Sequence, residues 1–466
     1  MKTGKVYIVG AGPGDPGLIT VKGLACLRKA DVVVYDYLAN EEFLDVLKDG
    51  TEKIYVGKKG GEHTLPQEAI NALIVEKARA GKNVCRLKGG DPFIFGRGGE
   101  EAETLAAAAI PFEVIPGVTS AIAVPAYAGI PLTHRNFTST VAFITGHEDP
   151  TQETSKIPWE KIATGAGTLV FLMGVGNLDL IAEELIRNGR SPQTPVAVIR
   201  WGTLPGQETL VGHLADIAAL AEKRKMKPPA IIVVGEVVGL REKLNWFESL
   251  PLFGKKILVT RTREQAGDLS RRLQELGAMA IEFPTLEIIP PASWDEVDHC
   301  LPRLREYNYI IFTSVNGVRS FVERIIARGG DIRDLKGPRI CAIGPKTAEI
   351  LEGMRVKVDF VPPEYRAEAI FQGLTKENLK GKRILIPRAK EAREILPEEL
   401  RKAGACVEVV AVYQTVAPEE GGQRVLELLQ AREIAAVTFT SSSTVVNFFE
   451  RIGRERAQEL LGGVVV

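Results

Sequence analysis

The chain has 466 residues, of which 45% are hydrophobic and 25% charged, and its 59 Lys and Arg residues balance 59 Asp and Glu residues. This length predicts several domains with sizeable cores, and the zero net charge gives no general attraction to nucleic acid or to an anionic membrane. No apolar run is long enough to span a bilayer, and a strand-like run starts at Lys5, which leaves no room for a signal peptide. We therefore expect a cytoplasmic protein.

The cysteines and histidines predict neither disulfides nor a structural metal. The five cysteines are odd in number, scattered, and never form a CxxC pair, and the five histidines are equally dispersed. Such cysteines are typical of buried free thiols in a reducing compartment. The cysteines are Cys26, Cys85, Cys300, Cys341 and Cys406.

The first motif is a glycine-rich loop between a strand at about 6–10 and a helix at about 18–29. Its Gly12-x-Gly14-x-x-Gly17 pattern, with Asp36 about 20 residues further on, matches a dinucleotide fingerprint. However, two prolines in the loop remove backbone donors, and Asp15 would place a carboxylate against the pyrophosphate. The loop is therefore predicted to approach a ligand other than a phosphate.

Two later strands also end in glycine-rich loops that carry charges. The first, at 53–56, leads into Gly57–His63 with Lys58 and Lys59, which indicates either a site for anionic groups or a solvated basic turn. The second, at 83–88, leads into Gly89–Glu101, where Arg97 and Glu100 either pair with each other or face one ligand. Because glycines are entropically costly unless close approach or a positive φ requires them, we favour a ligand site in the second loop.

Strands and helices continue to alternate as far as about Leu240, which predicts an α/β fold. Thr119 and Ser120 stand before an alanine-rich helix, where capping that helix is the simplest role for them. Met173, at the end of a strand, would on its own be a core residue.

The order of motifs in residues 1–240 resembles that of the uroporphyrinogen-III C-methyltransferases, which are tetrapyrrole methylases that use S-adenosylmethionine (SAM). The motifs are VGAGPGDPGLIT, YDYL, VGKKGG, LKGGDPFIFGRGGEE, PGVTS, LTHR, VFLMG and PPAIIVVGEVV. The resemblance implies a tetrapyrrole methylase fold of two α/β subdomains, at about 1–120 and 121–240, with SAM between them. The family's dimers imply a possible homodimer through this half.

The same resemblance implies roles for individual residues. Asp36 and Lys58 correspond to the family's proposed proton acceptor and donor, and Arg97, Glu100 and Arg135 would face the porphyrinogen. Lys59 and His134 would add cations for its eight carboxylates. Two methyl transfers, at C2 and C7, would give precorrin-2. The residues that would line the SAM site are Pro13, Gly89, Gly90, Asp91, Ile94, Thr119, Ser120, Met173, Gly202 and Ala230.

After an expected linker at 241–254, the second half contains an internal repeat. Segments such as KILVTR at 256–261 and RILIPR at 383–388, or FTS at 312–314 and at 439–441, recur at an offset of 127 residues. The repeat predicts two similar flavodoxin-like α/β domains. The counterpart of 341–347 would begin near position 468, so we expect the second unit to be incomplete.

This half resembles uroporphyrinogen-III synthase in the segments ILVTR, FTSVNGV, AIGPKTAEIL, LIPRA, VYQT and FTSSSTV. The resemblance implies cofactor-free cyclisation of hydroxymethylbilane between domain A (255–289 with 413–466) and domain B (290–412). Tyr413 either assists departure of the hydroxyl group or is a core tyrosine. Carboxylates would be held by Thr313, Ser314, Asn316 and Lys346.

Together these features predict a bifunctional enzyme of tetrapyrrole synthesis whose product feeds sirohaem or cobalamin. One alternative is a methylase of another precorrin or of a protein residue. The other is a second half that acts only as a binding or scaffolding module.

Overall fold

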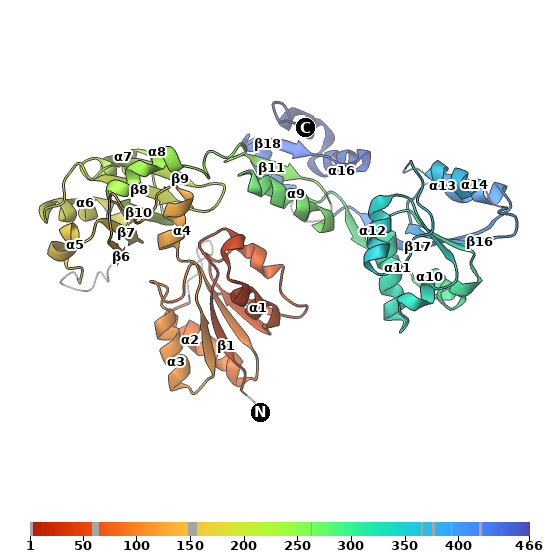
Figure 1. Ribbon diagram of the computed structural model, residues 1–466, viewed down its shortest axis with the longest axis horizontal. Coiled ribbons are helices and arrows are strands. Elements are labelled where there is room, and N and C mark those ends of the chain that lie inside the picture. Colours follow the sequence, from red (N-terminus) through yellow and green to blue (C-terminus); the bar gives the residue numbers. More distant parts are fainter. Residues whose placement is uncertain are drawn as a thin grey trace. The chain divides into compact units, whose positions relative to one another are not determined.

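A computed structural model describes residues 3–57, 65–147, 156–261, 263–364, 367–374, 378–392, 394–418 and 422–466. Contacts divide the chain into two compact units, Met1–Lys255 with Arg272–Met279, and Lys256–Arg271 with Ala280–Val466. Figure 1 shows α/β layers in both. No helix in the described ranges is long and apolar enough to cross a membrane.

The first sheet is entirely parallel, with strand order β3-β2-β4-β1-β5. Successive residues of a strand face opposite sides, so Val32 and Val34 pack toward α2 and α3 whereas Val33 packs toward α1. Figure 1 shows these helices on opposite sides of the sheet. The elements are β1 (Val6–Gly10), η1 (Pro16–Leu18), α1 (Val21–Lys29), β2 (Val32–Tyr35), η2 (Glu41–Leu44), β3 (Glu52–Tyr55), α2 (Gln67–Arg79), β4 (Val84–Lys88), α3 (Gly98–Ala107) and β5 (Phe112–Ile115).

The second sheet is mixed, with order β6-β7-β10-β8-β9. Strands β6 and β7 are parallel, and β10 runs antiparallel to β7 and β8. One face packs on α4, and the other on α6 and α7. The elements are α4 (Ser120–Tyr127), β6 (Val141–Thr145), α5 (Trp159–Gly165), β7 (Thr168–Leu172), η3 (Val175–Asn177), α6 (Leu178–Arg187), β8 (Pro195–Arg200), β9 (Glu208–His213), α7 (Ile217–Lys223), β10 (Ala230–Val234) and η4 (Glu236–Leu240).

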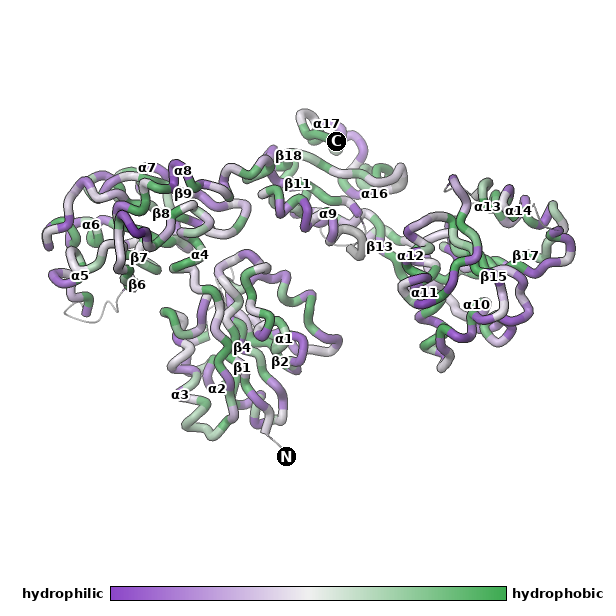
Figure 2. Tube along the Cα trace, viewed as in Figure 1, coloured by the Kyte–Doolittle hydropathy of each residue, from purple (hydrophilic) through white to green (hydrophobic). Residues whose placement is uncertain are grey.

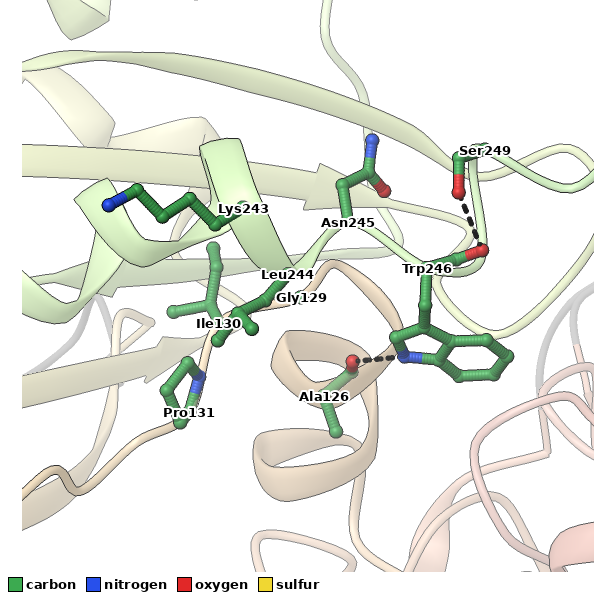
Figure 3. A pocket seen from close by; sticks show the side chains of 9 residues that line it. All are labelled: Ala126, Gly129, Ile130, Pro131, Lys243, Leu244, Asn245, Trp246 and Ser249. Atoms are coloured by element: carbon green, nitrogen blue, oxygen red, sulfur yellow. Dashed lines mark hydrogen bonds between the residues drawn. The ribbon is translucent and has the colours of Figure 1, made fainter.

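The segment expected to be a linker is packed against α4. It starts with α8 (Arg241–Leu244), and Arg241 donates a 2.6 Å hydrogen bond to the Ala128 carbonyl and pairs with Glu248. Phe247 is buried with its ring 4.9 Å from that of Tyr127, and Trp246 Nε1 donates to the Ala126 carbonyl. An open pocket of about 650 Å³ lies beside this contact, and Figure 3 shows the residues that line it. The segment expected to be a linker is therefore docked on α4, because its aromatic side chains bury apolar surface.

The second half contains a five-stranded sheet, β13-β17-β16-β14-β15, and a three-stranded one, β12-β11-β18. In Figure 2 the strands of the larger sheet include long hydrophobic stretches, and helices cover both of its faces. The strands are β11 (Lys256–Val259), β12 (Met279–Glu282), β13 (Glu287–Ile289), β14 (Tyr309–Phe312), β15 (Arg339–Ala342), β16 (Arg383–Ala389), β17 (Cys406–Val416) and β18 (Ile434–Thr438). The helices are α9 (Arg263–Glu275), α10 (Asp295–Cys300), η5 (Leu301–Glu306), α11 (Val315–Ala327), η6 (Ile332–Leu335), α12 (Pro345–Gly353), α13 (Ala367–Leu374), α14 (Ile395–Lys402), α15 (Gly422–Gln430), α16 (Ser442–Ile452) and α17 (Arg454–Leu460).

The larger sheet extends beyond the limits expected for domain B. Strand β17 has 11 residues, and its end pairs antiparallel with β13, so that Ile289 lies opposite Gln414. Ile289 and Tyr413 therefore belong to strands of this sheet; the expected division before 413 falls within β17, whereas the one after 289 coincides with the end of β13. The long strand β17 explains the difference, because it continues past the point where its parallel partner β16 ends.

The predicted repeat is visible in the strand register. In the larger sheet Ile310 of β14 lies opposite Leu385 of β16. Moving these positions by 127 residues, forward and back respectively, gives Val437 and Leu258, which lie opposite each other in the smaller sheet. Each sheet thus combines strands from both repeats, as expected for a chain that crosses between two related domains.

Candidate active sites

Three glycine-rich loops of the first half are in backbone contact where β1, β4 and β5 end. Gly12 and Gly90 form an antiparallel bridge, with N–H···O distances of 2.7 and 3.2 Å. A Cβ on Gly10 would lie 2.5 Å from the Cα of Gly117. Glycine is therefore required where these loops cross, since a side chain would collide with backbone atoms that cannot move aside.

Asp91 joins the same junction through both oxygens of its carboxylate. Oδ1 accepts from the Phe93 N–H at 2.8 Å and Oδ2 from the Gly117 N–H at 3.0 Å. Thr119 is the N-cap of α4, accepting from the Ala121 N–H, which confirms the capping role. Ser120 is the first helical residue, and its backbone nitrogen lies 3.6 Å from the position of a Cβ on Gly90.

A second junction connects the opening loop to the second sheet. The Asp15 N–H donates to Thr203 Oγ1 at 3.0 Å, and the Tyr127 hydroxyl donates to Asp15 Oδ2 at 2.6 Å. Burial and this hydrogen bond raise the pKa of Tyr127. Gly202 packs on Val124, whose Cγ1 would lie 2.4 Å from a Cβ there. The loop that resembled a dinucleotide fingerprint, which contains Pro13, is thus fixed between the two sheets.

An open pocket of about 480 Å³ lies between the Pro92–Glu100 loop and the ends of β6 and β7. Phe93 and Met173, on its wall, are 55% and 53% exposed and give the pocket an apolar lining of the kind that ligand sites have. Arg97 Nε and Nη2 bind the two Glu100 carboxylate oxygens at 2.9 and 2.7 Å. This contact holds the pKa of Glu100 below its usual range. The two residues therefore pair with each other and also line a candidate binding site.

Backbone strain is concentrated in these loops. Among the described residues other than glycine, nine have positive φ angles, and five of them are Phe95, Arg97, Met173, Trp201 and Thr203. Such conformations cost of order 1–3 kcal/mol each and cluster at functional sites. Their position at the pocket and at the second junction supports a binding role for both.

Asp36 follows β2, with its side chain 27% exposed. Its Oδ1 accepts from the Leu38 N–H at 3.2 Å, and its Oδ2 accepts from Arg86 Nη2 at 3.0 Å. Arg86 is buried and also binds buried Glu101, which in turn binds Lys88. Sequence analysis missed these three residues. The signal was available, since Arg86 and Lys88 are cations in a strand with apolar residues on either side of Arg86.

The other expected residues of the first half lie as follows. Lys58 and Lys59 fall outside the described residues. Gly89 packs on Leu38, Ile94 is 36% exposed in the pocket loop, Arg135 is exposed in the His134–Thr138 turn, and Ala230 begins β10. Within the described part of the chain, neither Arg135 nor Ala230 lines the open pocket.

In the second half, four of the expected residues gather where β14 and β16 end, because Tyr413 of β17 pairs with Ala389, the last residue of β16. Ser314 is the N-cap of α11, accepting from the Gly317 N–H, and its Oγ lies 3.1 Å from the Tyr413 hydroxyl. Thr313 and Asn316 flank it in sequence, and Lys346 lies in the first turn of α12 after the neighbouring strand β15. Tyr413 is 9% exposed, and burial raises its pKa. The ring of Tyr413 is therefore part of the core, while its hydroxyl group reaches Ser314 at the end of β14.

The two halves thus combine an α/β unit that has glycine-loop junctions and an open pocket with a pair of related α/β domains. Comparison with known proteins agrees with this division. Residues 5–218 match the family of tetrapyrrole (corrin/porphyrin) methylases, and residues 267–466 match uroporphyrinogen-III synthase HemD.

Individual relatives align with most of the chain or with its first half. "Porphyrin biosynthesis protein HemD" of Ruminiclostridium josui is 41% identical over 96% of this chain and 89% of its own length. "S-adenosyl-L-methionine-dependent uroporphyrinogen III methyltransferase" of Methanosarcina barkeri is 59% identical over 52% of this chain and 95% of its own length. A solved uroporphyrin III C-methyl transferase from Thermus thermophilus is 41% identical, covering 51% of this chain and all of its own, with a TM-score of 0.45. This chain belongs to the tetrapyrrole methylases in its first half and to the uroporphyrinogen-III synthases in its second.

Proposed function

We propose that the first half methylates uroporphyrinogen III at C2 and C7 with SAM, giving precorrin-2, and that the second half makes uroporphyrinogen III from hydroxymethylbilane. The relatives named for uroporphyrinogen III methylation and for HemD support the two activities. The observation that carries the methylation proposal is the open pocket between the Pro92–Glu100 loop and Met173. A homodimer, a cytoplasmic location, and use of the product for sirohaem or cobalamin remain predictions.

The residues of the loop junctions fit SAM. Because Gly90 has no Cβ, the space beside the backbone nitrogen of Ser120, at the start of α4, stays open. Exposed Met173 and Phe93 offer an apolar wall. When bound, SAM supplies a methyl group activated by its sulfonium centre. The loops contain prolines and carbonyl groups in place of a phosphate-binding nest, which suits a zwitterionic ligand without phosphates. Pro13, Gly89, Gly90, Asp91, Ile94, Thr119, Ser120, Met173, Gly202 and Ala230 remain our candidates for this site.

The charged residues would hold the porphyrinogen and move its proton. Arg97, oriented by Glu100, is placed to bind a porphyrinogen carboxylate, because a guanidinium suits planar anions. Lys58, Lys59 and Arg135 would add positive charge. Transfer of CH3+ leaves the methylated ring carbon without a hydrogen and gives the macrocycle a positive charge, so the macrocycle must lose a proton from another position, and we assign its acceptance to the Asp36 carboxylate.

In the second half, the sheet edge with Thr313, Ser314, Asn316 and Lys346 would bind carboxylates of hydroxymethylbilane. The backbone N–H groups at the start of α11 add to this preference for anions. Tyr413, whose hydroxyl reaches Ser314, would assist departure of the hydroxyl group. No cofactor is needed for this step in the proposed mechanism.

The test of the methylation proposal uses the full-length protein with uroporphyrinogen III and methyl-labelled SAM. We expect two labels per macrocycle and the precorrin-2 chromophore, with further methylation giving the trimethylpyrrocorphin spectrum. Absence of label in the macrocycle would refute the proposal. Label found only on a later precorrin or on protein would favour the alternative substrates.

A further inference from the structure

The buried face of β4 contains two cations that the proposed mechanism does not use. Arg86 and Lys88 are 3% and 4% exposed, and as alternate residues of a strand they face the same side. Glu101 of α3, which is 1% exposed, lies between them, with its Oε1 3.0 Å from Arg86 Nε and 2.8 Å from Lys88 Nζ. Gln67 of α2 donates to the same oxygen. These residues form a buried ion cluster between β4 and the helices α2 and α3.

Charge balance connects this cluster to Asp36. Burying a charge is unfavourable unless an opposite charge accompanies it. Glu101 neutralises one of the two cations, and the second carboxylate in contact with the cluster is Asp36, bound to Arg86 Nη2 at 3.0 Å. Asp36 is also the most exposed of the four, with 27% of its side chain exposed. It is therefore the member of the cluster that can meet a substrate.

The contacts of Arg86 fix the guanidinium group in one orientation. Its Nε binds Glu101, and its Nη1 donates to the carbonyls of Leu87 at 3.0 Å and Val34 at 3.4 Å. Val34 lies in β2, two residues before Asp36, so Arg86 binds both the strand and the carboxylate at its end. With the Leu38 N–H on Oδ1, the Asp36 carboxylate is held through both oxygens.

We infer that Arg86, held by Glu101, is the positioning residue for the Asp36 carboxylate during proton acceptance. This inference rests on the proposed function of the first half. Arg86 itself touches neither substrate nor SAM in this scheme and acts only through Asp36. Lysine cannot replace it, because a single ammonium group cannot reach Glu101, two carbonyls and Asp36 at once.

The test is a double-mutant cycle between Arg86→Lys and Asp36→Asn in the full-length protein. We expect Arg86→Lys to lower kcat for uroporphyrinogen III methylation by about 100-fold, the scale of a small misplacement of a reacting group. The KM for SAM should change less than about threefold. In the Asp36→Asn background the same substitution should change kcat less than about twofold, because residues that act together are not additive. Equal factors in both backgrounds would overturn the inference.

Lys88→Gln is the matched control, since it removes the other cation bound to Glu101 without touching Asp36. Its effect on kcat should be the same in both backgrounds; an effect that disappears with Asp36→Asn would give Lys88 the role assigned to Arg86.

If Arg86→Lys does not unfold cooperatively, and is therefore not properly folded, Asp36→Glu is measured in its place. That variant moves the carboxylate by one methylene and should lose nearly as much kcat as Asp36→Asn, whereas activity within threefold of wild type would overturn the inference. An inactive wild-type protein would instead refute the proposed function itself.

Discussion

At the scale of single residues, Asp36 has the most direct role in the proposed methylation. We predict that Asp36→Asn lowers kcat by about 100-fold or more, because general base catalysis contributes about 10²–10⁴ in rate. The dissociation constant of SAM, measured by calorimetry, should change less than about threefold. Equal losses in turnover and in SAM affinity would show that Asp36 contacts the cofactor.

Glu113 gives a prediction about pH. Lys22 and Lys5 both bind its carboxylate, and these contacts lower its pKa to about 2 from an ordinary value of 4.5. Because the folded-state pKa is lowered, the resulting stability is present above about pH 4.5 and is lost as the pH falls toward 2. In Glu113→Gln, the unfolding midpoint in urea should therefore fall less between pH 5 and pH 3 than in wild type.

This change in the pH dependence of stability should be small, since the side chains of Glu113, Lys5 and Lys22 are partly exposed and solvent screens their charges. Lys22→Met removes one of the two partners and should change the pH dependence in the same direction by a smaller amount. A pH dependence in Glu113→Gln that equals the wild-type one would contradict this account.

Residue roles were predictable from sequence where a local rule applied. Thr119 is an N-cap because a hydroxyl before an alanine-rich helix can accept from its first N–H groups. The contact between Arg86 and Asp36 could not be predicted, because it joins residues 50 positions apart on neighbouring strands. The hydrogen bonds of Asp15 with Tyr127 and Thr203 at one junction likewise depend on how two sheets meet.

At the scale of elements, the crossing of the glycine loops should be intolerant of any side chain. A Cβ on Gly117 would lie 2.3 Å from the Gly90 carbonyl oxygen and 2.7 Å from the Gly10 Cα. Gly117→Ala should lower the free energy of unfolding by about 1–3 kcal/mol, as overpacking does, and weaken SAM binding at least tenfold. Gly165→Ala in α5, where nothing lies within 4 Å, should change neither by a comparable amount. Normal SAM affinity in Gly117→Ala would contradict the proposed loop junction.

The docked segment after η4 gives a second prediction at this scale. Phe247 is 6% exposed and contacts the rings of Tyr127, Trp246 and Phe253. Phe247→Ala should lower the free energy of unfolding in urea by about 3 kcal/mol and admit proteolysis within residues 241–254. Trp246→Ala, at a half-exposed position with one hydrogen bond, should cost about 1 kcal/mol. Equal losses in both variants would contradict the burial of Phe247.

Two features at this scale could not be predicted from the sequence: the docking of this segment and the pairing of β13 with β17. The sequence of 241–254 has no regular periodicity, and its packing depends on Trp246 and Phe247 meeting α4. Strands such as β1 and β16 were predictable, because apolar runs bounded by glycine or charged residues leave little choice. The antiparallel partner of β17 was not, since β13 has only three residues.

At the scale of the whole molecule, the 127-residue repeat was the strongest long-range signal in the sequence. It predicted the related domains of the second half, and the equivalent registers of β14–β16 and β11–β18 confirm their relation. The sheets still differ, because one has five strands and the other three. In the smaller sheet Val465 forms a parallel bridge with Ala436, close to the position that Arg339 of β15 occupies beside Tyr309.

The two activities proposed for one chain form consecutive steps, since the product of the second half is the substrate of the first. The most direct measurement supplies the full-length protein with hydroxymethylbilane and methyl-labelled SAM and identifies the macrocycle isomer and its label. We predict the type III isomer with two labelled methyl groups. Formation of only the type I isomer, the product of spontaneous closure, or of type III macrocycle without label, would contradict the account.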